Sequence, residues 1–381
     1  MSHGTHTSTG KTTVLFVAAP APLGGSNQGL ATLLEALEDR IHRVVLAPPG
    51  AFTELIRSDA LAEEVIHLPR RGRFTLMGRA LQSLWALLVV FPRRSHLLAI
   101  HANATSGLRI AALAGLVCRV PVVCWVHDMA TSPRRQRWGS LVAILARSVV
   151  WAAVSDTARE VAINSRLCRH DQVTIVRNPI NPARVQSPPG VKGGERRSIC
   201  FLGRASSRKG FDLVPAVIER IQDTGDRWLL FTNRHPDPWA DPIWAQLDRL
   251  PAGQVTVLGF EKDVRKVYSQ CDIVFVPSRQ ESFGRVVAEA MMNSLPVVAT
   301  HIPSFVEQVG TNEAGLLFPI GDASAAAAAI DRLLGDENLR KDMGEEGKRR
   351  SRAYSPVAVA DQMFQLYSQS NRGRPSRVRL C

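Results

Sequence analysis

Residues 277–300 read PSRQESFGRVVAEAMMNSLPVVAT, and this stretch carries the clearest signal of the fold. A short apolar strand at residues 273–276 precedes it, and a second buried strand follows Pro296, with a helix between the two. Glu281 therefore lies on a loop at the C-terminal edge of a strand, where open α/β sheets bind ligands. Glu289 falls in the early turns of the helix. The order of strand, loop, helix and strand predicts a Rossmann-like sheet with two carboxylates at one edge.

The start of that predicted helix is suited to an anion. Backbone N–H groups near Phe283, Gly284 and Arg285 lack partners inside the helix, and such groups bind phosphate well. The carboxylates of Glu281 and Glu289 would repel an anion, and they suit the hydroxyl groups of a sugar or a ribose instead. The alternative is that both are ordinary surface carboxylates, since a second Glu at this spacing arises by chance about once in fifteen cases.

A basic loop follows another candidate strand, residues 198–202, which lies earlier in the chain. Arg204 and Lys209 lie on this loop beside a helix start. A departing diphosphate carries several negative charges, and fixed cations stabilise it. A solvated basic loop is the alternative, because Arg208 is also present. The pair of glutamates on another loop of the same sheet edge favours a diphosphate site.

Strands and helices alternate through the whole chain, which predicts an α/β fold with doubly wound parallel sheets. A length of 381 residues favours two domains. In the first half we expect strands at residues 14–18, 44–47, 65–68, 98–101, 122–126, 149–154 and 173–176. In the second half we expect strands at residues 198–202, 228–231, 255–258, 273–276, 296–299 and 316–318.

The segment QSPPGVKGG, residues 186–194, is rich in Pro and Gly and predicts an interdomain linker. We expect a disordered tail over residues 1–12, a first domain over 13–186, a linker over 187–197, a second domain over 198–355, and a terminal helix with a basic tail over 356–381. Two Rossmann-like domains would then face each other across a cleft in which a donor and an acceptor meet.

Charge is unevenly distributed along the chain. Residues 1–190 carry 21 Lys and Arg against 11 Asp and Glu, whereas residues 191–381 carry 26 against 23. One domain is therefore expected to meet an anionic partner. The first eleven residues lack the apolar core of a signal peptide, and no apolar run reaches the roughly 20 residues of a membrane span. We expect a cytoplasmic protein whose six cysteines are free thiols.

Basic and apolar residues gather around one predicted helix of the first domain. Arginines 70, 71, 73 and 79 precede or begin a helix that carries Leu81, Leu84, Trp85, Leu88 and Phe91, and Arg93 and Arg94 close it. A second basic cluster, Arg134, Arg135 and Arg137, is placed on the acceptor side. Such a surface suits reversible binding to the anionic inner face of a membrane. The alternative is that the apolar residues of the helix pack on the sheet.

Several short motifs resemble the donor-binding domain of glycosyltransferase family 4. In chain order these motifs are Gly203-Arg204, Lys209-Gly210, Gly259-Phe260 and the stretch at residues 277–300, with Glu307 beyond. The resemblance covers about residues 198–350, and it extends more loosely over the first domain through Gly24-Gly25, His127-Asp128, Ser155 and Asn178-Pro179. It implies a retaining enzyme of the GT-B fold that uses a nucleotide-sugar donor.

The resemblance also implies a role for each matched residue. Glu281 would contact the donor sugar, and Glu289 would contact the ribose. Arg204 and Lys209 would contact the diphosphate, and the amides of Phe283 and Gly284 would bind sugar hydroxyls or phosphate. The backbone near Phe260 would face the base, Gly25 would lie near the donor phosphate, and His127 would contact the transferred sugar. Ser294 and the segment Ile302-Pro303-Ser304 depart from the family pattern close to the sugar. The identity of the donor sugar is therefore left open.

The sequence thus predicts a metal-independent hexosyltransferase in which Arg204 and Lys209 replace a cation, since no Asp-x-Asp motif is present. No cofactor is expected besides the nucleotide-sugar co-substrate. The acceptor would be a glycan or a lipid-linked molecule of cell-envelope or exopolysaccharide synthesis, with no nucleic-acid partner. Two alternatives stay open. One is a sugar-nucleotide epimerase or a phosphorylase of the same fold, and the other is a non-catalytic basic protein that binds membrane or nucleic acid.

Overall fold

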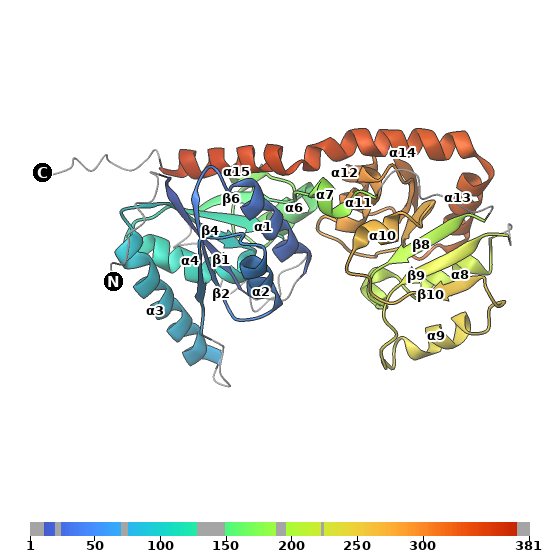
Figure 1. The fold of residues 1–381 in the computed structure, drawn as a ribbon, viewed down its shortest axis with the longest axis horizontal. Helices are drawn as coiled ribbons and strands as arrows, with labels where there is room; N and C mark the ends of the chain where they lie inside the picture. The colour runs from blue at the N-terminus through green and yellow to red at the C-terminus, as the bar shows by residue number, and fades with distance from the viewer. Residues whose placement is uncertain are drawn as a thin grey trace, which may run out of the picture. The chain divides into compact units, whose positions relative to one another are not determined.

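The computed structural model describes residues 11–19, 24–69, 75–127, 149–187, 196–221 and 225–371. The chain forms two compact units, Met1–Pro179 with Pro356–Cys381, and Ile180–Ser355. In each unit, helices pack around one sheet (Figure 1). The division at Pro179 falls a few residues before the linker that we expected from the sequence, and residues 188–195 of that linker lie outside the described ranges.

The described strands of the first unit form a parallel sheet in the order β3-β2-β1-β4-β5-β6-β7. Its strands are β1 (Thr13–Ala18), β2 (His42–Ala47), β3 (Glu64–His67), β4 (Leu97–Asn103), β5 (Val122–Val126), β6 (Val149–Ala153) and β7 (Val173–Ile175). Its helices are α1 (Gly25–Ala36), α2 (Ala51–Ser58), α3 (Thr75–Arg93), α4 (Thr105–Cys118), α6 (Asp156–Asn164) and α15 (Pro356–Asn371), with a short turn η2 (His170–Gln172). Every residue of β4 and β5 is buried, as expected for parallel strands that helices cover on both faces.

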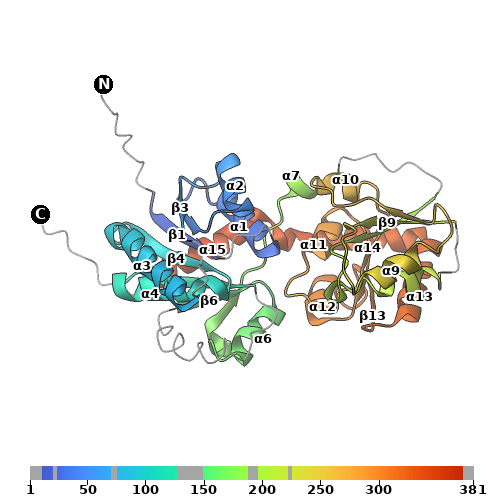
Figure 2. The ribbon, with the colours of Figure 1, turned by 90° about the horizontal axis from the view of Figure 1, so that it is seen from below.

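The C-terminal helix α15 belongs to the first unit, where it packs across β4 and α1 (Figure 2). The Tyr367 hydroxyl lies 2.7 Å from Nδ1 of His101, and both side chains are buried. Burial lowers the pKa of His101 to about 3, so this imidazole is neutral at physiological pH. The helix that we predicted after Ser355 is thus part of the first core.

Helix α3 buries Ala86, Val89 and Val90 but exposes five large apolar residues, so the alternative in which those five pack on the sheet is wrong. Leu81, Leu84, Trp85, Leu88 and Phe91 are between 41% and 61% exposed. The buried face includes Gln82 and Ser83, and Nε2 of Gln82 donates a 2.8 Å hydrogen bond to the Pro69 carbonyl. This satisfied amide lets a polar residue lie inside while the leucines lie outside. In the described ranges, no helix has the length and apolar character needed to cross a bilayer.

The second unit contains a parallel sheet in the order β10-β9-β8-β11-β12-β13 among its described strands. The strands are β8 (Ser198–Leu202), β9 (Arg227–Phe231), β10 (Val255–Val257), β11 (Ile273–Val276), β12 (Val297–Thr300) and β13 (Gly315–Phe318). The helices are α7 (Pro182–Val185), α8 (Leu213–Ile218), α9 (Asp241–Leu247), α10 (Val264–Tyr268), α11 (Arg285–Met292), α12 (Pro303–Val309), α13 (Ala323–Gly335) and α14 (Glu337–Ser351), with the turns η3 (Ser207–Lys209) and η4 (Arg352–Tyr354).

The strand order of the second unit reverses between β8 and β11. Successive strands lie on one side of β8 and on the other side of β11, and the two central strands pair with each other. In open α/β sheets, a ligand crevice forms at such a reversal, outside the carboxyl ends of the strands. The predicted strands are confirmed to within two residues at their ends. Both predicted loops, after β8 and after β11, therefore reach the same crevice.

The predicted free thiols are confirmed for the described cysteines. Cys118, Cys124, Cys200 and Cys271 are buried free thiols, and Cys168 is a partly exposed one. The remaining cysteine, Cys381, lies outside the described ranges.

Candidate active site

The loop after β8 turns sharply and brings Lys209 back over the end of its own strand. Gly203 follows β8, η3 spans Ser207–Lys209, and Gly210 takes the left-handed conformation with φ +66°. The carbon atoms of the Lys209 side chain lie against Gly203, at 3.7 Å from the position of a Cβ there. The ammonium group is thus held at the carboxyl end of the sheet.

The loop after β11 meets this lysine. Oε1 of Glu281 lies 2.5 Å from Nζ of Lys209 and 3.3 Å from Nη1 of Arg208. The side chains of Glu281 and Lys209 are only 11% and 18% exposed, so the pair is largely shielded from water. The structure therefore brings together two residues 72 positions apart that the sequence singled out.

Arg204 lies on the same loop but is held differently. Its side chain is exposed, and it makes no hydrogen bond or ion pair with any described residue. Its guanidinium is therefore available to an anion that enters the crevice.

Helix α11 begins at Arg285, directly after Gly284, which has φ +82°. A Cβ at Gly284 would lie 2.3 Å from the ring of Phe305, so only glycine fits there. The Phe283 ring is buried against Tyr354, at 5.3 Å between ring centres, and its side chain cannot contact a ligand. The backbone remains: within the described ranges, the amides of Phe283 and Gly284 donate no hydrogen bond.

Glu289, in the second turn of α11, is 8% exposed and has a partner on each carboxylate oxygen. Nη2 of Arg285 lies 3.0 Å from Oε1, and the Tyr268 hydroxyl donates a 2.9 Å hydrogen bond to Oε2. Burial, with the adjacent Glu289 carboxylate, raises the pKa of Tyr268 well above its usual value. Sequence reasoning missed Tyr268, because no local pattern links two residues 21 positions apart.

Phe260 lies on the loop after β10, the edge strand of the same sheet. The Phe260 side chain is 71% exposed, and its N–H donates a 2.8 Å hydrogen bond to Oδ1 of Asn233. Gly259 before it has φ +71°. Asn233 lies on the loop after β9 and was also missed by sequence reasoning.

The first unit holds the remaining predicted residues. Gly24 and Gly25 begin α1, and His127 follows β5 with its ring 4.5 Å from that of Trp125. Ser155 caps α6, because its hydroxyl accepts a 3.0 Å hydrogen bond from the Ala158 N–H. Asp128, Arg134, Arg135 and Arg137 lie outside the described residues.

Two family profiles together span most of the chain. Residues 23–184 match the profile described as Glycosyltransferase Family 4, and residues 184–350 match the one described as Glycosyl transferases group 1. The chain belongs to glycosyltransferase family 4. The protein is therefore an enzyme, a glycosyltransferase, and the resemblance found in the sequence is confirmed.

Curated relatives of this glycosyltransferase carry related names. The phosphatidyl-myo-inositol mannosyltransferase of Mycolicibacterium smegmatis is 26% identical over 362 residues, 90% of each chain. The D-inositol 3-phosphate glycosyltransferase of Corynebacterium glutamicum is 27% identical over 294 residues, which is 66% of this chain and 67% of that relative.

Solved structures support the fold of this family 4 enzyme. HepE from Anabaena, in complex with UDP, superposes with a TM-score of 0.80 at 22% identity, over 94% of this chain and 100% of HepE. A glycosyltransferase from Rickettsia africae has a TM-score of 0.80 at 17% identity, over 96% and 100% of the two chains. The predicted GT-B class, with two Rossmann-like domains, is confirmed.

Proposed function

We propose that this glycosyltransferase moves a sugar, with retention of configuration, from a nucleotide-sugar donor to a hydroxyl group of a glycan or lipid-linked acceptor of the cell envelope. The observation that carries the proposal is the contact between Lys209 and Glu281 at the carboxyl ends of β8 and β11. Relatives named as phosphatidyl-myo-inositol mannosyltransferase and as a lipopolysaccharide core glycosyltransferase support a lipid-linked or glycan acceptor.

The basic loop after β8 stabilises the departing diphosphate. Lys209 carries three N–H donors, so it can keep its contact with Glu281 and still donate to a phosphate oxygen. Arg204, exposed on the same loop, adds a second positive charge. Because these cations would take the role of a metal ion, the enzyme is expected to work without one and without any cofactor.

The carboxylates and the histidine bind and orient the sugar nucleotide. Glu281 accepts a hydrogen bond from a hydroxyl of the donor sugar, and Glu289 accepts from the ribose. The backbone at Phe283 and Gly284 binds phosphate or sugar hydroxyls, as expected of a helix start. The backbone near Phe260 faces the base, Gly25 lies near the donor phosphate, and His127 orients the transferred sugar.

Retention follows from attack on the face from which the diphosphate leaves. The acceptor oxygen forms the new bond to the anomeric carbon while the bond from that carbon to the phosphate oxygen breaks. The acceptor proton passes to the departing phosphate oxygen, so no side chain forms a covalent adduct. A trapped glycosyl adduct on any side chain would contradict this course of reaction.

The function is tested with a panel of UDP-, GDP- and dTDP-sugars, scored by thermal shift and by nucleotide release in the presence and absence of EDTA. We expect one nucleotide class to stabilise the protein, with turnover that survives EDTA. Glu281→Gln should lower turnover while leaving the affinity for the bare nucleoside diphosphate nearly unchanged, because this carboxylate contacts the sugar. Equal losses for the nucleotide sugar and the bare diphosphate would contradict the assignment, and an absolute requirement for Mg²⁺ or Mn²⁺ would contradict the metal-free mechanism.

We also propose that the enzyme binds reversibly to the anionic cytoplasmic face of a membrane through α3. Five large apolar side chains lie exposed on this helix, and the guanidinium of Arg94 lies over the Phe91 ring at 3.9 Å. The excess of basic residues in the first half of the chain complements an anionic leaflet, where each Lys or Arg contributes about 1 kcal/mol.

Vesicle flotation tests the membrane proposal. We expect anionic liposomes, but not neutral ones, to capture the protein, and high salt to release it because charge is screened. Leu84→Gln with Leu88→Gln should abolish capture, because burying apolar side chains contributes about 1.5–3 kcal/mol each. Val357→Gln is the matched control, since Val357 is an equally exposed apolar residue on α15. A wild type that ignores anionic vesicles at low salt would leave a soluble acceptor as the better interpretation.

A further inference from the structure

The Glu289 carboxylate is held from two helices at once. Tyr268, the last residue of α10, donates to Oε2, and Arg285, the first residue of α11, contacts Oε1 at 3.0 Å. Tyr268 is 1% exposed. A buried carboxylate without partners would be strongly destabilising, so these two partners compensate for the burial of Glu289 and fix its carboxylate in place.

The position of Arg285 is unfavourable for the helix itself. A cation in the first turn of a helix opposes the helix dipole, which favours anions there. The order of Arg before Glu at this spacing is also the weaker orientation of a helical ion pair. Helix stability therefore gives no reason for an arginine at the start of α11. The reasons for an arginine here are its contact with the Glu289 carboxylate and the phosphate site proposed at the start of α11.

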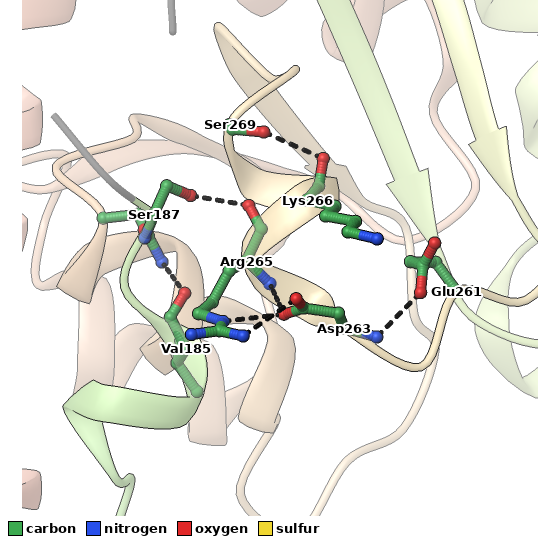
Figure 3. A network of polar contacts seen from close by, with 8 residues as sticks. Val185, Ser187, Glu261, Asp263, Arg265, Lys266 and Ser269 are labelled. Atoms are coloured by element: carbon green, nitrogen blue, oxygen red, sulfur yellow. Dashed lines mark hydrogen bonds and ion pairs between the residues drawn. The ribbon is translucent and has the colours of Figure 1, made fainter. Parts of the chain in front are cut away.

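Helix α10, which carries Tyr268, is itself anchored by polar contacts (Figure 3). Asp263 caps its start, with Oδ1 accepting a 3.2 Å hydrogen bond from the Arg265 N–H, and the Asp263 N–H donates to Oε1 of Glu261 at 2.8 Å. The Ser187 hydroxyl donates to the Arg265 carbonyl at 2.8 Å. The Tyr268 hydroxyl thus extends from a helix with a fixed start.

We propose that Tyr268 and Arg285 are positioning residues that hold the Glu289 carboxylate for the ribose hydroxyls, and so set the preference for ribonucleotides. This inference rests on the proposed ribose role of Glu289. A carboxylate has about four lone-pair sites, and the two partners use one on each oxygen. One site on each oxygen is left, which matches the two adjacent hydroxyls of a ribose. A carboxylate already fixed loses little side-chain entropy when the nucleotide binds.

The burial of Tyr268 keeps its hydroxyl in the protonated form that donates to Glu289. Burial and the adjacent Glu289 carboxylate raise the pKa of Tyr268 well above its usual value, so the phenol is protonated at neutral pH and can donate. A tyrosine that merely satisfied its own hydroxyl would affect stability alone. A positioning tyrosine also affects how well the site distinguishes a ribose from a deoxyribose, and this difference provides the test.

The test measures binding of UDP and GDP to the full chain by calorimetry, each beside its 2′,3′-dideoxy form. We expect the wild type to bind the ribose form of its preferred nucleotide about ten- to a hundredfold more tightly. The ratio of the two affinities, ribose form over dideoxy form, is the quantity compared between variants. Tyr268→Phe should reduce this ratio by about tenfold, with the affinity for the dideoxy form nearly unchanged. Arg285→Lys should keep more of the ratio than Arg285→Gln, because the lysine retains the charge.

Tyr367→Phe is the matched control. Tyr367 is also fully buried and hydrogen-bonded through its hydroxyl, but it lies in the first unit. This variant should lose stability like Tyr268→Phe and keep the wild-type ratio. In the background of Glu289→Gln, the change of Tyr268 to Phe should add no further loss of ratio.

The outcomes separate the inference from the function on which it rests. A folded Tyr268→Phe and a folded Arg285→Gln that both keep the wild-type ratio would overturn the positioning role and leave the ribose role of Glu289 intact. If Tyr268→Phe fails to fold, Arg285→Gln, near the edge of the site, still decides. A wild type that binds ribose and dideoxy forms equally would overturn the ribose role together with this inference, whereas sugar transfer in the donor panel would still stand.

Discussion

Lys209→Ala should lower turnover by about two to three powers of ten, the scale seen when one preorganised donor to a developing charge is removed. The ammonium group lies 2.5 Å from Glu281 at the carboxyl end of the central strands, on a side chain that is only 18% exposed. In this variant Arg208, 3.3 Å from the same oxygen, is the described cation that still contacts Glu281, so the carboxylate that we propose contacts the sugar is also held less firmly. Arg204→Ala should lower turnover by a similar factor, because we propose that both cations face the diphosphate.

Nucleotide release under saturating donor measures this effect, and donor affinity is followed by calorimetry. Lys266→Ala is the matched control, since Lys266 is an exposed lysine on α10 of the same unit. We expect the control to retain wild-type turnover. A folded Lys209→Ala enzyme that lost less than about tenfold would show that the leaving group is stabilised elsewhere.

The sequence predicted the positions of Lys209 and Glu281 because two kinds of information agreed. Apolar runs located β8 and β11, and the rule that ligands bind at the carboxyl ends of strands located the loops. Neither the motif after β8 nor the motif after β11 predicts that these two strands are neighbours in the sheet. Their adjacency follows from the reversal of strand order, which the alternation of strands and helices makes possible but does not specify.

Other contacts could not be predicted because they depend on tertiary packing. The sequence placed five large apolar residues on α3, but the buried face carries Ala86, Val89 and Val90 together with Gln82, whose amide the Pro69 carbonyl satisfies. The pairing of Tyr268 with Glu289 requires α10 to lie beside α11. The return of α15 to the first unit brings together Tyr367 and His101, which lie 266 residues apart.

Gly210 is one of the points at which the two loops of the candidate site touch, and its replacement tests that contact. A Cβ at Gly210 would lie 2.0 Å from the Pro277 carbonyl oxygen, on the loop that leads to Glu281. Pro277 contributes backbone atoms there, and these cannot turn aside as a flexible side chain can. Gly210 is also left-handed, with φ +66°, a conformation that is unfavourable for alanine.

Gly210→Ala should therefore destabilise the second unit by about 2–5 kcal/mol, of which about 1–2 comes from the backbone conformation and the rest from the steric clash. Relief of the clash would move the loop after β8 away from the loop after β11 and separate Lys209 from Glu281. Chemical denaturation gives the loss of stability, and calorimetry should show a loss of donor binding as well. Gly253→Ala is the control, because Gly253 has φ +82° and no atom lies within 4 Å of a Cβ there. This change should therefore lose only the stability that comes from the backbone conformation. If Gly210→Ala costs no more than Gly253→Ala and binds donor normally, then the contact between the loops does not hold the lysine and the glutamate in place.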